Sequence, residues 1–255
     1  MNFEIIDFHT HPFVSIDDCI CGYKDTMPMS TELIADQLSS CGIGTFCGSV
    51  INKRGNGFDG QRTANADAML LADKFGGRYI PGIMVDANFA DESCLEIDKA
   101  AELGVKLIGE LVPYTYRWRY DDKGFYEILE HAKNKIPLVS VHTMWDAGIE
   151  KAVEDNKDIT FVLAHPGEQN SVFRHIELMK KCENAYLDIS GLGLFRYGVL
   201  SKLISEVGAE RILFGTDYPV CNPGDYVGGV LAEKISDNDK ELIFSGNAKK
   251  LLGLQ

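Results

Sequence analysis

The sequence predicts an α/β fold of one domain over residues 1–255, the (β/α)8 or TIM barrel. Apolar, β-branched segments alternate with amphipathic segments along the whole chain, as they do where helices cover a buried parallel sheet. Eight such strand–helix pairs fit into 255 residues, close to the length of about 250 residues that is typical of this barrel. The alternative, a doubly wound open sheet, lacks a GxGxxG fingerprint, because GNGFDG (55–60) and GLG (191–193) do not match it and are interpreted as loops.

The predicted strands are short runs rich in Val, Ile, Leu and Phe, and most of them are apolar on both faces. They span residues 4–11, 45–51, 78–85, 105–111, 137–143, 159–165, 185–190 and 211–217. Helices are predicted between the strands, where apolar residues recur at helical spacing. The first begins at Ser30 and Thr31 and ends at Gly42, which are typical cap residues. The predicted helices span residues 29–42, 62–76, 91–104, 124–135, 148–157, 171–182, 198–208 and 239–254.

Charge and cysteine content narrow the range of partners and compartments. The net charge is −13, from 38 acidic and 25 basic residues, and such a surface repels nucleic acid and anionic membranes. The sequence shows no apolar run long enough for a transmembrane helix and no signal-peptide pattern at its N-terminus. Seven cysteines without a paired CxxC set indicate reduced thiols and a cytoplasmic protein. The expected partner is a small-molecule substrate, and assembly into a homo-oligomer stays open.

Four histidines and one aspartate fall at the C-terminal ends of predicted strands, where barrel enzymes carry their active sites. They are His9, His11, His142, His165 and Asp217. His9 and His11 are two residues apart, so both side chains point to the same face of the first strand. Neutral imidazoles with a carboxylate suit Zn²⁺, and Mn²⁺, Fe²⁺, Co²⁺ or Ni²⁺ also fit. The sequence therefore predicts a site for a divalent metal, with zinc as the first choice.

Further carboxylates extend this prediction to one or two ions. Asp217 beside a metal can be a ligand or accept a proton from metal-bound water. Glu110 ends the fourth strand, and it could bridge two metals if its side chain points inward, or pair with a neighbour if it is exposed. Lys106 and Ile108 are expected on the same strand face as Glu110. Asp7, deeper on the first strand, is expected to hydrogen-bond a ligand histidine.

The loop after the fourth strand, VPYTYRWRYDD, collects aromatic and cationic side chains in an acidic protein. One hypothesis is that Arg117 or Arg119 binds an anionic group of the substrate, with Tyr114 in an aromatic wall around it. The alternative is an exposed packing loop or an oligomer contact. Three residues that follow strand-end ligands are expected to line the same pocket: Trp145, Tyr218 and Cys221.

The HxH pair on strand 1, the histidines on strands 5 and 6 and the aspartate on strand 8 together resemble the metal-ligand pattern of the amidohydrolase superfamily. The similarity is greatest to its amidohydrolase 2-like branch, which contains hydrolases, lactonases and aromatic-acid decarboxylases, and it runs through IIDFHTHP, VHT, LAHPG, FGTDYP and SGNAKKLLGL. The resemblance implies that His9, His11 and His142 bind metal and that Asp217 is a ligand and proton acceptor. For His165 it implies a ligand in two-metal members and a catalytic residue in some one-metal members.

The fourth strand carries a second resemblance. Gly109-Glu110 is similar to the Gly-Glu of TatD-like members, in which the glutamate bridges two metals. Other two-metal members use a carboxylated lysine on this strand, but Lys106 is expected to lie too deep in the barrel for that role. The chain departs from the decarboxylases in being compact, with little room for their usual loop insertions.

The expected function is a metal-dependent hydrolase that acts on an amide, a lactone or a related carbonyl or ester-type bond. Metal-activated water attacks that bond and Asp217 takes the proton, with His165 as the second catalytic residue. The alternative is a nonoxidative, metal-dependent decarboxylase of a small carboxylic acid. A third interpretation is a catalytically silent barrel used for binding, although the sequence lacks none of the expected ligands.

Overall fold

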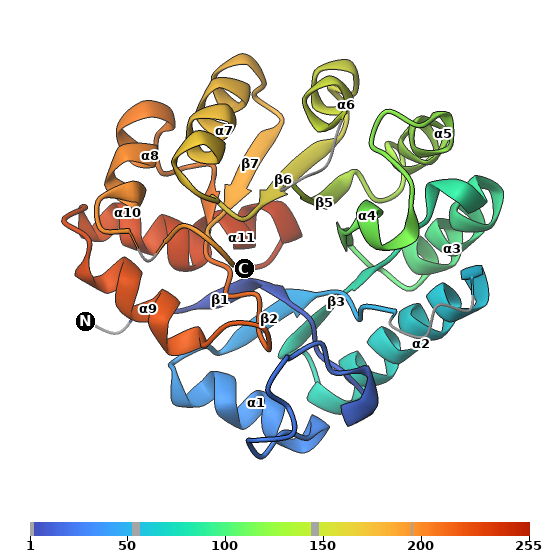
Figure 1. The fold of residues 1–255 in the computed structure, drawn as a ribbon, viewed down its shortest axis with the longest axis horizontal. Coiled ribbons are helices and arrows are strands. Elements are labelled where there is room, and N and C mark those ends of the chain that lie inside the picture. Colours follow the sequence, from blue (N-terminus) through green and yellow to red (C-terminus); the bar gives the residue numbers. More distant parts are fainter. Residues whose placement is uncertain (1–2, 53–56, 144–147, 195) are drawn as a thin grey trace.

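The structure is a computed structural model that describes residues 3–52, 57–143, 148–194 and 196–255. Eight parallel strands lie side by side in chain order, and the helices surround them on the outside (Figure 1). The predicted barrel is confirmed, and every predicted strand is present in a shorter form. The strands are β1 (Ile6–Thr10), β2 (Thr45–Gly48), β3 (Tyr79–Ile83), β4 (Leu107–Leu111), β5 (Leu138–His142), β6 (Thr160–Ala164), β7 (Ala185–Asp188) and β8 (Ile212–Leu213).

Backbone hydrogen bonds between β1 and the segment after β8 bring the two ends of the sheet together. The His11 N–H donates to the Tyr218 carbonyl at 2.7 Å, and the Asp217 N–H donates to the His9 carbonyl at 2.9 Å. This contact joins residues that are more than 200 positions apart in the chain. It places the side chains of His9, His11 and Asp217 at one mouth of the barrel.

Most helices lie where the sequence predicts them. The predicted helix at 239–254 consists of α10, a π-helical turn (Leu242–Gly246) and α11. Residues 57–60, which the sequence places in a loop, form the first turn of α2 instead. The helices are α1 (Thr31–Ser40), α2 (Gly57–Phe75), α3 (Ala90–Glu102), α4 (Pro113–Tyr116), α5 (Lys123–Ala132), α6 (Ile149–Asp155), α7 (Gln169–Lys181), α8 (Val199–Val207), α9 (Pro223–Ala232), α10 (Asp237–Glu241) and α11 (Asn247–Leu252).

Two helices were not predicted, for different reasons. The Asn222 side chain caps α9 by accepting from the Gly224 N–H at 3.0 Å. The interior of α9 contains Gly228 and Gly229. These residues weaken the helical pattern in the sequence because glycine is a poor helix former. The other, α4, is one turn inside the loop after β4, too short to show a helical period.

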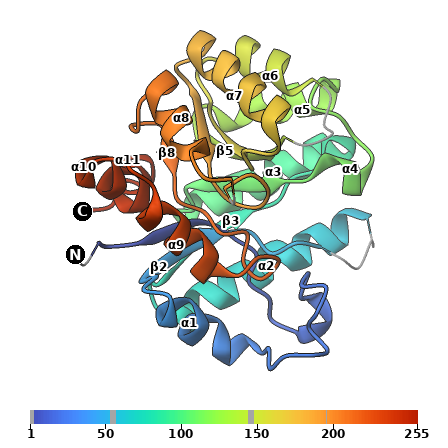
Figure 2. The same ribbon diagram turned by 60° about the vertical axis from the view of Figure 1, so that its left-hand side comes forward.

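Apolar side chains pack on both sides of the strands. The larger cluster joins the strands to the helices and includes the fully buried Phe46, Phe161 and Phe214. A second cluster combines residues of seven strands with Ala248 and Leu252 of α11. In Figure 2, α11 lies beside the segment that leads into β1. The members of the second cluster are Ile6, Phe8, Cys47, Leu107, Leu138, Val162, Tyr186, Leu213, Ala248 and Leu252.

Several members of this second cluster, such as Leu107 and Leu138, are the first residues of their strands. The beginnings of the strands are therefore apolar, and polar side chains gather at the opposite ends, as in other barrel enzymes. No helix among the described residues is long and apolar enough to cross a membrane.

Candidate metal centre

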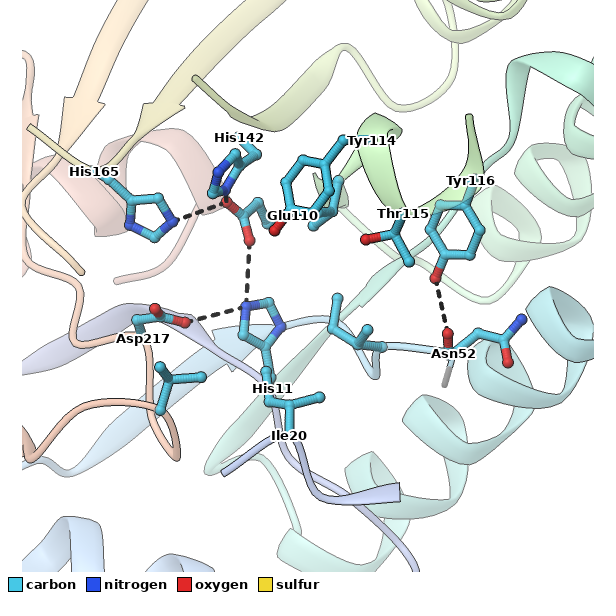
Figure 3. Close-up of a pocket in the computed structure, with 13 residues that line it drawn as sticks. His11, Ile20, Asn52, Glu110, Tyr114, Thr115, Tyr116, His142, His165 and Asp217 are labelled. Atoms are coloured by element: carbon cyan, nitrogen blue, oxygen red, sulfur yellow. Dashed lines mark hydrogen bonds and ion pairs between the residues drawn. The ribbon is translucent and has the colours of Figure 1, made fainter. Parts of the chain in front are cut away.

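The structure brings all six predicted metal ligands together at the C-terminal mouth of the barrel. Figure 3 shows these ligands except His9. Five of these side chains are buried, and the Asp217 side chain is 14% exposed. They divide into two groups that share Glu110. The first ligand group is His9, His11 and Asp217, and the second ligand group is His142 and His165.

The first ligand group surrounds the Oε2 atom of Glu110. The Nε2 atoms of His9 and His11 lie 3.1 Å apart, and each is 3.3 Å from Glu110 Oε2. Asp217 Oδ1 lies 3.7 Å from His9 Nε2 and 3.5 Å from His11 Nε2. Two nitrogens and two carboxylate oxygens thus face one point. The same-face prediction for His9 and His11 is confirmed.

The second ligand group surrounds the other oxygen of the same glutamate. His142 Nδ1 lies 2.9 Å from Glu110 Oε1, and His165 Nε2 lies 3.2 Å from it. This group offers fewer ligand atoms than the first one. Figure 3 shows Glu110 between the two groups.

The donor and acceptor inventory of the first ligand group fits a cation. His11 Nδ1 lies 3.0 Å from the Ser49 carbonyl, which can only accept, so this nitrogen carries the proton. His9 Nδ1 lies 3.0 Å from Asp188 Oδ2 and donates to it for the same reason. In the neutral imidazoles both Nε2 atoms then present lone pairs to each other and to Glu110. Only a positive charge at that point satisfies them, and imidazole with carboxylate is a ligand set for Zn²⁺ or Mn²⁺.

The pKa shifts of His9 and Glu110 also indicate that this site favours positive charge. Burial lowers the pKa of His9, but Asp188 and Glu110 raise it well above its usual value. Burial raises the pKa of Glu110, but His9 and His165 hold it well below its usual range. The pKa of Asp217 is raised by burial. A field that favours imidazolium over imidazole also favours a bound metal ion.

Two of these residues have strained backbones. His165 has φ of 68° and Asp217 has φ of 65°, in the left-handed region that non-glycine residues seldom adopt. They are two of the three non-glycine residues with positive φ in the described part of the chain. Such strain concentrates at functional sites, where surrounding contacts hold it in place.

Glu110 points inward because β4 is irregular. The pairing of β4 with β5 shifts register between Ile108 and Leu111. Ile108 belongs to the cluster under the helices, and Lys106 is exposed before the strand begins. The expectation that Lys106 and Ile108 share the face of Glu110 is therefore wrong. Gly109 allows the irregularity, since a Cβ there would lie 2.2 Å from the Ser140 carbonyl oxygen.

Two residues of the site were missed by the sequence analysis. Asp188 ends β7 and Ser190 follows it, and both are fully buried against His9. Polar residues at the end of the predicted strand 185–190 were the available signal, because the predicted ligands occupy the same position on their own strands. Ser49, whose carbonyl accepts from His11, contributes only its backbone and leaves no such signal.

Asp7 hydrogen-bonds a ligand histidine, as expected, and it does so through the backbone of His9. Its Oδ1 accepts from the backbone N–H of His9 at 3.1 Å and from the Thr216 N–H at 3.0 Å. Its Oδ2 accepts from the Thr216 hydroxyl at 2.6 Å. These bonds of Asp7 reach the backbone of a ligand histidine and not its ring. Asp7 therefore joins the two strand ends that carry His9 and Asp217.

The ligand groups open into a cavity of about 570 Å³. Tyr114 lines this cavity, as predicted, and its ring centroid lies 5.2 Å from that of His142 in an edge-on contact. Tyr116 closes another part by donating from its hydroxyl to the Asn52 carbonyl at 3.2 Å. The described lining residues are His11, Ile20, Ile51, Asn52, Glu110, Val112, Tyr114, Thr115, Tyr116, His142, His165, Asp217 and Val220.

The structure does not bring the two predicted arginines to this cavity. Arg119 makes a two-pronged ion pair with Asp121 at 2.7 and 2.9 Å, and its side chain is 57% exposed. Arg117 is exposed after α4 and has φ of 60°. The Asp121 carboxylate therefore holds Arg119 in a local ion pair, which the sequence did not predict. Anion binding by either residue stays a prediction and would need a change in this loop.

Other expected lining residues lie elsewhere. Tyr218 and Cys221 line a separate cavity of about 420 Å³ on the other side of Val220. Trp145 falls outside the described residues. His175 is buried in α7, with its Nε2 3.0 Å from the Thr143 hydroxyl.

Comparison with known proteins shows the family to which this chain belongs. A family model described as amidohydrolase (Amidohydro_2) matches residues 6–254. One curated relative, the γ-resorcylate decarboxylase of Polaromonas sp. strain JS666, is 42% identical over 72 residues. That alignment covers 28% of this chain and 22% of the relative, so the chain matches about a fifth of that protein's length.

Solved structures share the fold over the whole chain. A 2,6-dihydroxybenzoate decarboxylase from Rhizobium superposes with a TM-score of 0.74 at 17% identity, covering 98% of this chain and 99% of that one. A dihydroxybenzoic acid decarboxylase from Polaromonas sp. JS666, solved with manganese and 2-nitroresorcinol, gives a TM-score of 0.70 at 18% identity and covers 99% and 97%. With the family model matching nearly every residue, the chain belongs to the amidohydrolase family.

Proposed function

We propose that this enzyme is a metal-dependent, nonoxidative decarboxylase of a small aromatic carboxylic acid. The observation that carries the proposal is the 42% identity to a γ-resorcylate decarboxylase over 72 residues. Two similar structures are also decarboxylases of dihydroxybenzoic acids. This favours the decarboxylase alternative over the hydrolase that the sequence analysis put first.

The cavity suits a ring-shaped ligand. Its volume of about 570 Å³ lies within the range of small-molecule sites, about 300–1,000 Å³. Ile51, Val112 and Val220 form apolar walls, and Tyr114 supplies an aromatic face. Asn52 and Thr115 offer polar atoms farther from the ligand groups (Figure 3). Such walls would exclude water from the reacting carbon.

The chemistry divides between a divalent ion and the residues of the chain. When bound at the first ligand group, the ion would orient the substrate and draw negative charge from it. Loss of CO₂ breaks the bond from the ring carbon to the carboxyl carbon, and the electron pair stays on the ring carbon until a proton arrives. Asp217 and His165 both line the cavity beside the ligands, so we assign delivery of that proton to Asp217 in its protonated form or to His165 as the imidazolium.

A second candidate is hydrolysis, and Glu110 is the observation that favours it. Its two oxygens face different ligand groups at 2.9 to 3.3 Å, as a carboxylate between two ions would. Two ions can stabilise both the attacking and the leaving oxygen of a hydrolytic reaction. The Gly109-Glu110 pair keeps the TatD-like resemblance as part of this second proposal.

One experiment separates the two candidates. The protein is stripped of metal, reloaded with Mn²⁺ or Zn²⁺, and tested for CO₂ release from hydroxybenzoic acids and for cleavage of lactones, amides and phosphate esters. His11→Ala serves as the inactive variant. His131→Ala serves as its matched control, because His131 pairs with Asp98 outside the site.

CO₂ release that requires metal and His11, but not His131, supports decarboxylation. Cleavage of lactones, amides or phosphate esters with the same dependence, and no CO₂ release, replaces it with the hydrolase. Tight metal binding at His11 with neither activity on the panel would contradict both reactions as stated.

A further inference from the structure

The Ser190 hydroxyl contacts one histidine of each ligand group, at the ring nitrogen that faces away from Glu110. Ser190 Oγ lies 3.0 Å from His9 Nδ1 and 3.0 Å from His165 Nδ1. It also hydrogen-bonds Asp188 Oδ1, which accepts from the Ser190 backbone N–H at 2.9 Å as well. Ser190 and Asp188 are both fully buried, so these contacts replace hydrogen bonds to water.

The proton inventory of this cluster has one satisfactory solution. A serine hydroxyl donates one bond and accepts two, whereas a carboxylate only accepts. The Ser190 proton therefore goes to Asp188, and Ser190 Oγ accepts from His165 Nδ1–H. His9 Nδ1–H is shared between Ser190 and Asp188 Oδ2, each 3.0 Å away. If Ser190 donated to a histidine instead, its lone pairs would face the carboxylate at hydrogen-bond distance.

This arrangement decides which nitrogens are available to a metal. With the protons on Nδ1, His9 and His165 both present bare Nε2 atoms to Glu110. His9 Nε2 lies 3.3 Å from Oε2, and His165 Nε2 lies 3.2 Å from Oε1. A single Asp–Ser pair thus sets one ligand atom in each ligand group.

Tight packing holds the serine and the His165 ring in this relation. Gly191 has φ of 61°, and a Cβ on it would lie 2.3 Å from His165 Nδ1. A Cβ on Gly215 would lie 3.2 Å from the Ser190 Cβ and 2.8 Å from the His9 Cβ. His9, His165 and Asp188 could themselves be read as a metal site, but the Ser190 hydroxyl already bonds all three.

We propose that Asp188 and Ser190 are positioning residues that hold His9 and His165 as Nδ1–H tautomers and so couple the two ligand groups. The inference rests on the metal centre of the proposed function but not on which reaction it performs. Removing a hydrogen-bond partner of a metal ligand typically lowers metal affinity by about 10- to 100-fold. Losing Asp188 affects both histidines, whereas losing Ser190 leaves His9 its bond to Asp188.

The test combines histidine NMR with metal titration on the full-length protein. In metal-free wild type, ¹⁵N spectra at a pH where both rings are neutral should show His9 and His165 protonated on Nδ1. In Ser190→Ala, His165 should become a mixture of tautomers while His9 and His11 keep theirs. Zn²⁺ titration should show weaker binding by about 10- to 100-fold in Ser190→Ala, and weakening of both ligand groups in Asp188→Asn.

Ser93→Ala is the matched control, because Ser93 is fully buried and its hydroxyl bonds the Asp86 backbone and not a ligand. It should bind Zn²⁺ like wild type. A wild-type His165 protonated on Nε2 would overturn the proposal, as would unchanged Zn²⁺ binding in both variants. Wild type that binds no divalent ion at all would instead defeat the proposed function, and comparison of the His165 tautomers in wild type and Ser190→Ala would still decide whether the Asp–Ser pair sets them.

Discussion

The two ligand groups differ in completeness, although one glutamate serves both. In the first ligand group, two Nε2 atoms and Asp217 gather within 3.7 Å of one another beside Glu110. Hydrogen bonds at Nδ1 hold both histidine rings of this group in place. In the second, His142 and His165 are the only described residues that flank the other oxygen, and Tyr114 borders them at the cavity. We infer that the first group holds an ion tightly and that the second leaves room for a substrate.

The largest expected effect separates the two groups directly. His11→Ala should abolish tight metal binding at the first ligand group and lower kcat/KM by about 10⁴-fold, because a metal supplies several kcal/mol of charge stabilisation. His142→Ala should keep one tightly bound ion. Elemental analysis and steady-state kinetics measure both results. Complete loss of metal from His142→Ala would show that the groups do not bind independently.

Glu110→Gln tests the link between the groups. We expect a two-step metal titration in wild type and loss of its weaker step in the variant, with kcat/KM lowered by about 10³-fold. Isothermal titration with Mn²⁺ or Zn²⁺ measures the steps. Glu233→Gln is the control, because Glu233 is equally buried but accepts from Gly198 and Ser201 away from the site. A wild type with a single step would remove the second ligand group as a metal site.

Asp7 lies behind the first ligand group, and its charge makes stability depend on pH. Burial raises the pKa of Asp7 from 3.8 to about 7. Between these values the folded state holds a proton that the unfolded state has lost, so the contribution of Asp7 to stability falls as pH rises, by about 4 kcal/mol at most. Asp7→Asn should remove this contribution, so the stability of the variant should rise with pH relative to that of wild type. Urea denaturation of the metal-free protein across this pH range measures it, and parallel curves for wild type and variant would refute it.

His175 lies behind the second ligand group and should show the opposite sign. Burial lowers the pKa of His175 from 6.5 to about 4. In this range the unfolded state binds the extra proton, so the contribution of His175 to stability rises with pH, by about 3 kcal/mol at most, and it opposes the contribution of Asp7. His175→Gln keeps a polar partner for Thr143 and should remove this contribution, so the stability of the variant should fall with pH relative to that of wild type. The same denaturation series measures this difference, and parallel curves for wild type and variant would contradict the assignment.

The smallest effect is expected in the loop beside the second ligand group. Arg119→Ala should change KM by less than about twofold, because its exposed ion pair with Asp121 contributes little. Tyr114→Ala should raise KM more, since Tyr114 lines the cavity. Substrate titrations compare the two variants. A tenfold rise in KM for Arg119→Ala would restore the anion-binding hypothesis and require the loop to move on binding.

Much of the site follows from rules that act within one strand. The spacing of His9 and His11 predicts their shared face because strand side chains alternate. The positions of His142, His165 and Asp217 at strand ends predict a common mouth because parallel strands of a barrel end together. The apolar character of the strands predicts the barrel itself. Each of these signals lies in a few neighbouring residues.

The remaining features depend on contacts between distant parts of the chain. Glu110 turns inward at a register shift against β5, which no alternation pattern reveals. Ser190 meets His9 across 181 positions of sequence, and only the packed barrel brings them into contact. The residue types and their strand positions were thus determined by the sequence alone. Tertiary structure decided which buried polar atoms meet, because hydrogen bonds between strands depend on how the barrel closes.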